Sequence, residues 1–259
     1  MRDKIAGQDI PIKSYEFIAT PIDFIIVSFK NTDYVKLALE SLEHFINHPH
    51  TVTIIDNGSD IDRYKKIYRN KNNYQILEGP QKGIWSKPGD GSRNHSAGLA
   101  LGMKNTSNPI VCFLDCDILF LDSWTFEILP LLEDNFLVTN RFDRNICREM
   151  FMIFKRENFE KYDLYPDATH IDSCGNITKM AAKHGESCVI LENTAFSMEG
   201  NYIGDKSKHV LDVPYGEQCS IYDKPIFFHY GRGETRSEED QQKFVNEARR
   251  YLDEYDSII

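Results

Sequence analysis

Long hydrophobic runs are absent from this chain of 259 residues, and so are closely paired cysteines. No apolar stretch approaches the roughly 18–20 residues that cross a bilayer, and the N-terminal segment lacks the apolar core of a secretory signal. The six cysteines form no Cys-x-x-Cys pair, which is typical of reduced thiols. We therefore expect a soluble, cytoplasmic protein without a transmembrane segment, and peripheral attachment to a membrane stays open.

Positive charge is also in short supply, because 30 Lys and Arg stand against 40 Asp and Glu, a net charge of −10. This balance argues against a general nucleic-acid coat and against a basic membrane-surface protein. Only 15 Gly and 10 Pro are spread along the chain, which excludes a fibrous or low-complexity protein. With 41% hydrophobic and 27% charged residues, the composition is that of a globular chain.

Strand and helix patterns alternate from residue 23 onward. Short apolar runs predict buried strands, and apolar residues at helical spacing predict the helices between them. In the first half we expect strands at 24–27, 51–55, 74–77 and 110–121, and helices at 32–46, 61–69 and 94–104. In the second half we expect strands at 136–139, 150–154, 187–191 and 225–229, and helices at 172–184 and from 237 onward. The alternation predicts an α/β fold with a mostly parallel central sheet flanked by helices and a ligand site at the carboxyl ends of its strands.

The most informative motif is Asp115-Cys116-Asp117, which lies inside the long apolar run 110–121. If that run is one strand, alternation points both carboxylates to the same side. Two like charges in an apolar setting repel each other, and a divalent cation such as Mn²⁺ or Mg²⁺, carrying a polyphosphate, would remove that cost. The alternative is that the two aspartates face water or cap the next helix.

Four segments in this order resemble the GT-A glycosyltransferases, and among them the family 2-like enzymes that use sugar nucleotides. They are Phe24 to Asn31, Ile54 to Asp60, Gly91 to Leu99, and the strand that carries the Asp-x-Asp motif. The resemblance covers residues 23–121 well and 150–230 loosely. It implies a single GT-A domain, Rossmann-like, over 23–235, with a nucleotide-sugar-binding half (23–121) and an acceptor half (122–235). An N-terminal extension (1–22) would precede it and a C-terminal helix (236–259) would follow.

The resemblance also implies the reaction. A sugar would move from a nucleotide-diphosphate donor, UDP- or GDP-linked, to a hydroxyl of a glycan, a lipid-linked or another acceptor, with inversion at the anomeric carbon. Nucleic acid is disfavoured by the charge but stays open as an acceptor. The family's roles assign Asp115 to the ribose or the metal, and Asp117 and His229 to the metal. For His229 the alternative is a strand-end histidine bonded to a backbone carbonyl.

Donor-binding residues are expected at the ends of the first two strands. Val27 and Ser28 would offer backbone groups to the rim of the base. Asp56 would accept from a base N–H or a ribose hydroxyl, and it can also form an Asx turn with Gly58.

Further donor contacts are expected from Arg93, Asn94 and His95. Arg93 would bind the base or the diphosphate, and Asn94 and His95 would lie at a helix N-terminus, which favours anions. His95 is equally well explained as a structural histidine. Arg232, in a glycine-containing segment, would fold over the diphosphate as part of a lid, and a solvated loop is the alternative.

An inverting reaction needs a carboxylate that takes the acceptor proton. In related enzymes this residue begins a helix in the acceptor half, and Asp172 fits that position. A simple helix cap is the alternative for Asp172, and Asp167 and Glu149 are the reserve candidates.

Two other enzyme classes and a binding module are alternatives to the glycosyltransferase. An aspartate-based phosphohydrolase would carry its Asp-x-Asp motif on the first core strand, whereas this one lies on about the fourth. A sugar-nucleotide pyrophosphorylase would have a glycine-rich loop after its first strand, where this chain has Ser28 to Asn31. A non-catalytic module that binds a nucleotide or a glycan stays open.

Overall fold

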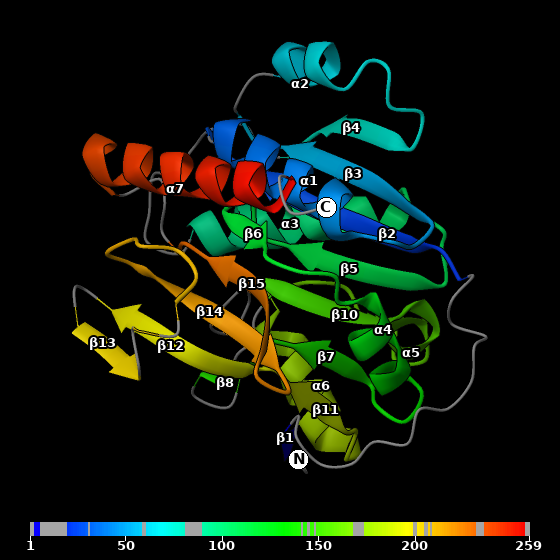
Figure 1. Ribbon diagram of the computed structural model, residues 1–259. Helices are drawn as coiled ribbons and strands as arrows, with labels where there is room; N and C mark the ends of the chain where they lie inside the picture. The colour runs from blue at the N-terminus through cyan, green and yellow to red at the C-terminus, as the bar shows by residue number, and fades with distance from the viewer. Residues whose placement is uncertain are drawn as a thin grey trace.

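The fold is described from a computed structural model in which most of the chain is defined (Figure 1). The described residues are 3–5, 20–30, 32–58, 61–80, 90–140, 142–143, 146–147, 149–167, 174–198, 201–204, 207, 209–231 and 236–256. None of the helices in these ranges is long and apolar enough to cross a bilayer.

An eight-stranded sheet forms the centre of the molecule, in the order β1-β11-β7-β10-β5-β2-β3-β4. Every neighbouring pair is parallel except those of β10, which runs antiparallel to both β5 and β7. The strands are β1 (Asp3–Ile5), β2 (Ile22–Ser28), β3 (His50–Asp56), β4 (Tyr74–Glu78), β5 (Ile110–Leu114), β7 (Leu137–Thr139), β10 (Phe151–Lys155) and β11 (Cys188–Ile190). The predicted α/β fold with a mostly parallel central sheet is confirmed, and β1 adds a strand inside the predicted N-terminal extension.

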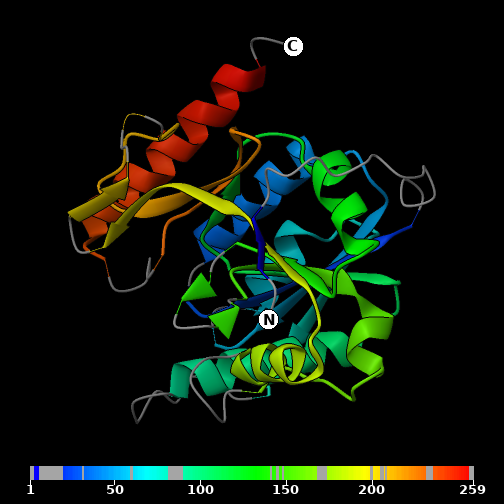
Figure 2. The same ribbon diagram turned by 90° about the horizontal axis from the view of Figure 1, so that it is seen from below.

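Helices cover both faces of this sheet (Figures 1 and 2). Ile22, Phe24 and Ile26 of β2 face the core under α1, whereas Ile25 and Val27 face the core under α3 and α6. This alternation is the period of two that a strand buried on both faces requires. The helical elements are α1 (Thr32–Phe45), α2 (Ile61–Ile67), α3 (Asp90–Lys104), α4 (Thr125–Ile128), the 3₁₀ helix η2 (Leu129–Leu132), α5 (Arg156–Glu160), α6 (Gly175–His184) and α7 (Glu238–Asp256).

Two glycines of α3 let this helix lie close to β2. A Cβ at Gly98 would come within 2.9 Å of the Val27 side chain, and one at Gly102 within 2.4 Å of Ile25. These two small residues therefore allow close packing of α3 against the sheet. The start of the helix was predicted wrongly, because α3 begins at Asp90 rather than at Asn94.

A second, antiparallel sheet lies beside the first, in the order β13-β12-β14-β15-β6. The strands are β6 (Ile118–Phe120), β12 (Glu192–Met198), β13 (Asn201–Gly204), β14 (Gly216–Ile221) and β15 (Lys224–His229), and a small pair is formed by β8 (Phe142–Asp143) and β9 (Ile146–Cys147). The helix α7 packs on the second sheet through Phe244 and Ala248, which are buried with Phe228 and Tyr230. Ser237 caps α7, since its Oγ accepts the Asp240 N–H at 3.1 Å.

Candidate functional site

The Asp115-Cys116-Asp117 motif forms a turn between β5 and β6, so the prediction of one long strand over 110–121 is wrong. The chain leaves the central sheet at the end of β5 and enters the second sheet with β6, which pairs with β15. Backbone bonds hold the turn from both sides: Asp115 N–H donates to Met150 O at 3.0 Å, and Tyr230 N–H donates to Asp117 O at 3.0 Å. The two carboxylates therefore converge through a turn, and strand alternation does not explain their position.

His229 completes a three-residue cluster at this turn. Its Nε2 lies 3.4 Å from Asp115 Oδ2 and 3.2 Å from Asp117 Oδ1. One ligand atom from each of the three residues lies within 4.8 Å of the others. Asp117 and His229 are buried, and Asp115 is half-buried. Two carboxylates and an imidazole nitrogen form a donor set that suits Mn²⁺ and also Mg²⁺, so these residues fit a divalent cation.

Glu217, which the sequence analysis did not single out, touches the cluster from β14. Its Oε1 lies 2.9 Å from His229 Nδ1. The two residues are directly opposite each other in the β14–β15 ladder, and Glu217 is 2% exposed. A glutamate inside a strand whose residues are all buried was the available signal.

These carboxylates change the acid–base behaviour of His229. Burial alone lowers the pKa of His229, but the Asp117 charge and the contacts with Asp115, Asp117 and Glu217 outweigh burial and raise the pKa well above 6.5. A cation held by Asp115 and Asp117 would take the place of the proton on His229 Nε2, because a histidine that ligates a metal is neutral.

His95 and Glu149 lie on the other side of Asp115. His95 Nε2 is 3.6 Å from Asp115 Oδ1, and His95 Nδ1 is 3.4 Å from Glu149 Oε1. Glu149 is 7% exposed, and its Oε2 is buried without a hydrogen-bond partner among the described residues. Because α3 begins at Asp90, Asn94 and His95 lie one turn inside the helix, and the expectation that they occupy its N-terminus is wrong.

The ends of β2 and β3 lie at the carboxyl edge of the sheet, as does the end of β5. Asp56 is 5% exposed, and its carbonyl accepts the Gly79 N–H at 2.9 Å. The Ser28 hydroxyl is 2.5 Å from Tyr64 Oη, so this side chain has a structural partner. Val27 is covered by Gly98 of α3, which leaves backbone groups as its means of contacting a base.

Asn57 is a further residue that the sequence analysis passed over. Its Nδ2 donates to Asn94 O at 2.8 Å, which fastens α3 to the end of β3. Asn57 and Asn94 are 2% and 3% exposed, so this contact is part of the interior. Arg93, by contrast, is exposed on the first turn of α3.

Two predicted site residues, Asp172 and Arg232, lie outside the described residues. The reserve candidate Asp167 is half-buried, and its backbone N–H donates to Asn176 Oδ1 at 3.3 Å. This bond leaves Asp167 beside α6, whereas Glu149 reaches the Asp115 cluster through His95.

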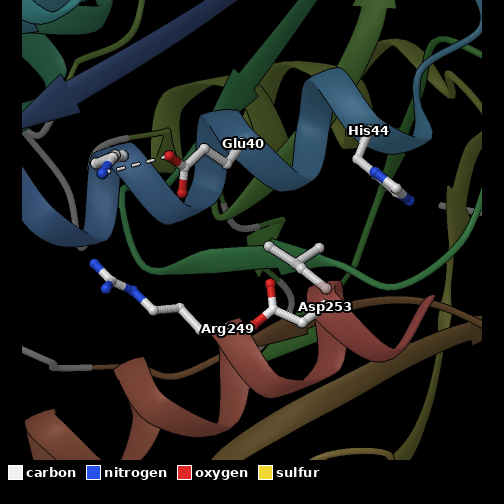
Figure 3. Close-up of a pocket in the computed structure, with 6 residues that line it drawn as sticks. Glu40, His44, Arg249 and Asp253 are labelled. Carbon is white, nitrogen blue, oxygen red and sulfur yellow. Dashed lines mark ion pairs between the residues drawn. The ribbon is translucent and has the colours of Figure 1, made fainter. Parts of the chain in front are cut away.

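A separate groove of about 470 Å³ lies between α1 and α7. Figure 3 shows Glu40 and His44 of α1 facing Arg249 and Asp253 of α7 across it. The lining carries charges of both signs, including a Lys36–Glu40 pair at 3.5 Å. The groove contains none of the residues predicted for the site.

Comparison with known proteins gives one family and several similar folds. The model of Glycosyl transferase family 2 matches residues 23–181. The mannosyltransferase PcManGT from Pyrobaculum calidifontis, solved in complex with GDP-Man and Mn²⁺, superposes with a TM-score of 0.53 at 13% identity, over 66% of this chain and 55% of that one. No curated protein sequence matches the chain.

TarS from S. aureus (residues 1–349) gives a TM-score of 0.47 at 15% identity, over 73% of this chain and 61% of that one. The complex of TarS with UDP-GlcNAc gives a TM-score of 0.47 at 16% identity, over 66% of this chain and 56% of that one. The chain thus spans between 55% and 61% of the length of these structures. The likeness to PcManGT shows a common fold.

Proposed function

Because the chain belongs to glycosyl transferase family 2, we propose that it moves a sugar from a nucleotide-diphosphate donor to a hydroxyl of an acceptor. The observation that carries this proposal is the cluster of Asp115, Asp117 and His229 at the carboxyl edge of the mostly parallel sheet. Ligands of open α/β sheets bind at that edge. The acceptor would be a glycan, a lipid-linked or another hydroxyl compound.

Asp115, Asp117 and His229 would hold the divalent cation, Mn²⁺ or Mg²⁺, that the donor diphosphate brings with it. The fit is supported by ligand atoms within 4.8 Å of one another and by the donor set of two carboxylates and one imidazole. When bound, such a cation acts as a Lewis acid that stabilises negative charge on the leaving diphosphate.

The donor would be UDP- or GDP-linked and would lie across the ends of β2 and β3. Asp56 would accept a hydrogen bond from the base or the ribose, and the backbone of Val27 and Ser28 would border the base. Arg93 is exposed on the first turn of α3, and it would contact a phosphate or the base from there. His95, at 3.6 Å from Asp115, would lie beside the ribose and the diphosphate.

Asn94 contributes differently, because its carbonyl accepts from Asn57 and its side chain is buried. We propose that Asn94 shapes the donor site by holding α3 against β3. Arg232 would cover the diphosphate and keep water out.

The reaction would proceed with inversion in one displacement. A carboxylate takes the proton of the acceptor hydroxyl while the acceptor oxygen bonds to the anomeric carbon. The bond from that carbon to the diphosphate breaks, and its electron pair leaves with the diphosphate. Asp172 is the proposed base, from its position before α6, with Glu149 and Asp167 in reserve.

A panel of nucleotide sugars tests the proposed function. Thermal unfolding of the full chain is measured with UDP- and GDP-linked sugars, each with Mn²⁺ and with a chelator, and GDP-Man is included because PcManGT binds it. A ligand at a hundred times its Kd stabilises the folded chain by about 2.7 kcal/mol. Donors that stabilise are then tested for hydrolysis and transfer. Binding of a nucleotide without turnover of any donor would favour the non-catalytic module.

The cytoplasmic location predicted from the cysteines stays a prediction. In the described part of the chain, no disulfide joins Cys112, Cys116, Cys174, Cys188 or Cys219.

A further inference from the structure

Glu217 is a buried acid that the proposed transfer reaction does not use. It lies on β14 directly across from His229 on β15, and opposite residues of an antiparallel pair present their side chains on the same face. The Glu217 Oε1 to His229 Nδ1 distance is 2.9 Å, the length of a good charge-assisted hydrogen bond. Glu217 and His229 are 2% and 7% exposed, so water does not compete for this contact.

A third carboxylate at this place is costly. Asp115 and Asp117 already put two negative charges beside His229, and a buried charge destabilises the fold unless it is paired and hydrogen-bonded. A neutral side chain could fill the same space in β14 without that repulsion. The acid is therefore better explained by what it does to the His229 ring.

The Glu217 contact gives the two ring nitrogens of His229 different roles. A carboxylate only accepts hydrogen bonds, so His229 Nδ1 must carry a proton and donate a hydrogen bond to Glu217. Nε2 then faces Asp115 at 3.4 Å and Asp117 at 3.2 Å, the side on which a cation would lie. Histidine ligands of metals in proteins are commonly oriented by such a carboxylate on the far nitrogen.

The backbone at Gly231 lies beside the His229 ring. Gly231 adopts φ +70°, and a Cβ there would lie 3.4 Å from His229 Cε1. Packing limits where the ring can go, but it does not decide which nitrogen carries the proton. That choice depends on Glu217.

We propose that Glu217 is a positioning residue, which fixes the tautomer and the orientation of His229 so that Nε2 is ready to bind a divalent cation. This inference rests on the proposed function only for the reason that a cation binds there, namely to hold the donor diphosphate. The contact itself is independent of the donor and of the acceptor.

The proposal is tested without any turnover by measuring the affinity of the full chain for Mn²⁺ alone. The EPR signal of free Mn²⁺ reports how much of the ion is bound. Glu217→Ala should weaken Mn²⁺ binding by about 10–100-fold, the usual effect of removing the carboxylate behind a histidine ligand. Glu217→Gln should recover much of this loss, because the amide oxygen still accepts the Nδ1–H. Ser220→Ala is the matched control. It removes a buried hydroxyl without a described hydrogen-bond partner from the same strand, and Mn²⁺ affinity should stay within about 2-fold.

A double-mutant cycle separates positioning from general damage to β14. In His229→Ala, the further change Glu217→Ala should cost no more Mn²⁺ affinity, since the ring that Glu217 orients is gone. An undiminished effect in that background would overturn the proposal, as would wild-type affinity in Glu217→Ala. If circular dichroism shows that Glu217→Ala does not fold, Glu217→Gln is tested instead by its Co²⁺ absorption spectrum. A Co²⁺ spectrum of Glu217→Gln without histidine ligation would contradict the expected rescue and overturn the proposal. Mn²⁺ binding with no effect of Glu217 rejects this inference alone, whereas wild-type protein that binds no Mn²⁺ rejects the cation site as well.

Discussion

His229 Nε2 lies 3.2 Å from Asp117 Oδ1, although the two residues belong to distant parts of the chain. The contact is made possible by the second sheet, where β15 pairs with β6 and brings His229 opposite Ile118. A residue of the predicted acceptor half (122–235) thus completes a cluster that begins in the predicted nucleotide-sugar-binding half (23–121). We therefore expect metal binding by this cluster to depend on the β5–β6 turn and on β15.

Loss of one aspartate should uncouple nucleotide binding from the metal. In wild-type protein, UDP or GDP should bind more tightly with Mn²⁺ than with a chelator, because Asp115 and Asp117 would hold a cation that offsets the charge of the diphosphate. Asp117→Ala should reduce that difference at least 10-fold, as measured by isothermal titration calorimetry. Cys116→Ala, in the same turn, is the control and should keep the difference. Equal binding with and without Mn²⁺ in wild-type protein would contradict the cation site.

Donor affinity should depend on Asp56 and Arg93 in different ways. Each lost charge-assisted hydrogen bond should cost about 1.5–3 kcal/mol of binding. Arg93 is exposed, so Arg93→Ala should leave the free energy of unfolding within about 0.5 kcal/mol of wild type. Asp56 is 5% exposed, and Asp56→Asn is the variant that preserves its volume. If Asp56→Asn lowers the melting temperature but leaves the affinity for the nucleotide unchanged, Asp56 only forms the turn after β3.

The central sheet could be predicted from the sequence because its strands are short, apolar on both faces and separated by helical patterns. The run 110–121 misled the prediction because its apolar character continues from β5 into β6. Apolar periodicity reports burial, and it does not report that a chain changes from one sheet to another. The two aspartates mark that change, because they lie in the turn between the two sheets.

The candidate site was predicted in part. Asp115, Asp117 and His229 were named from the sequence, and the structure brings them together. Glu217 was missed because a single glutamate within a strand carries no spacing signal, and its role depends on register with β15. Ser28 and Val27 were named for their backbone groups, and the contacts of their side chains with Tyr64 and Gly98 do not test that prediction.

A buried ion pair at the opposite edge of the sheet should affect stability and not donor binding. Arg156 Nη2 lies 3.0 Å from Asp23 Oδ2, and Asp23 also accepts the Asn108 N–H at 2.7 Å. Removing one partner leaves the other charge buried, so Arg156→Met should cost about 3–5 kcal/mol of unfolding free energy in urea. Donor affinity of the folded fraction should not change. Wild-type stability in Arg156→Met would show that water replaces the pair.

The contact between Glu43 and His50 should make stability depend on pH. The hydrogen bond from His50 lowers the pKa of Glu43 from 4.5 to about 2; burial opposes this shift, and Tyr74 supports it. A carboxyl with a lowered pKa stabilises the fold above its unfolded pKa. The free energy of unfolding should therefore fall as the pH drops from about 4.5 to about 2, by about 1 kcal/mol, because the pair is partly exposed and screened.

His50 acts in the opposite direction. Burial lowers the pKa of His50, but Glu43 and the His48 carbonyl more than offset burial, so the pKa is raised above 6.5. Its stabilising effect is complete below 6.5 and is lost as the pH rises through the raised pKa. Urea unfolding of Glu43→Gln across the pH range should show a flatter profile at both ends. An unchanged acid limb in Glu43→Gln would assign the acid dependence to other carboxylates.

The identity of the base is tested by two variants that remove a carboxylate and keep its shape. If Asp172 takes the acceptor proton, Asp172→Asn should keep metal-dependent donor binding and lose transfer by about 100-fold or more, the usual scale of general base catalysis. Glu149→Gln is the comparison, because Glu149 is buried beside His95 and has one oxygen without a described partner. Transfer within a few-fold of wild type in Asp172→Asn, together with a loss of that size in Glu149→Gln at unchanged donor affinity, would move the role to Glu149.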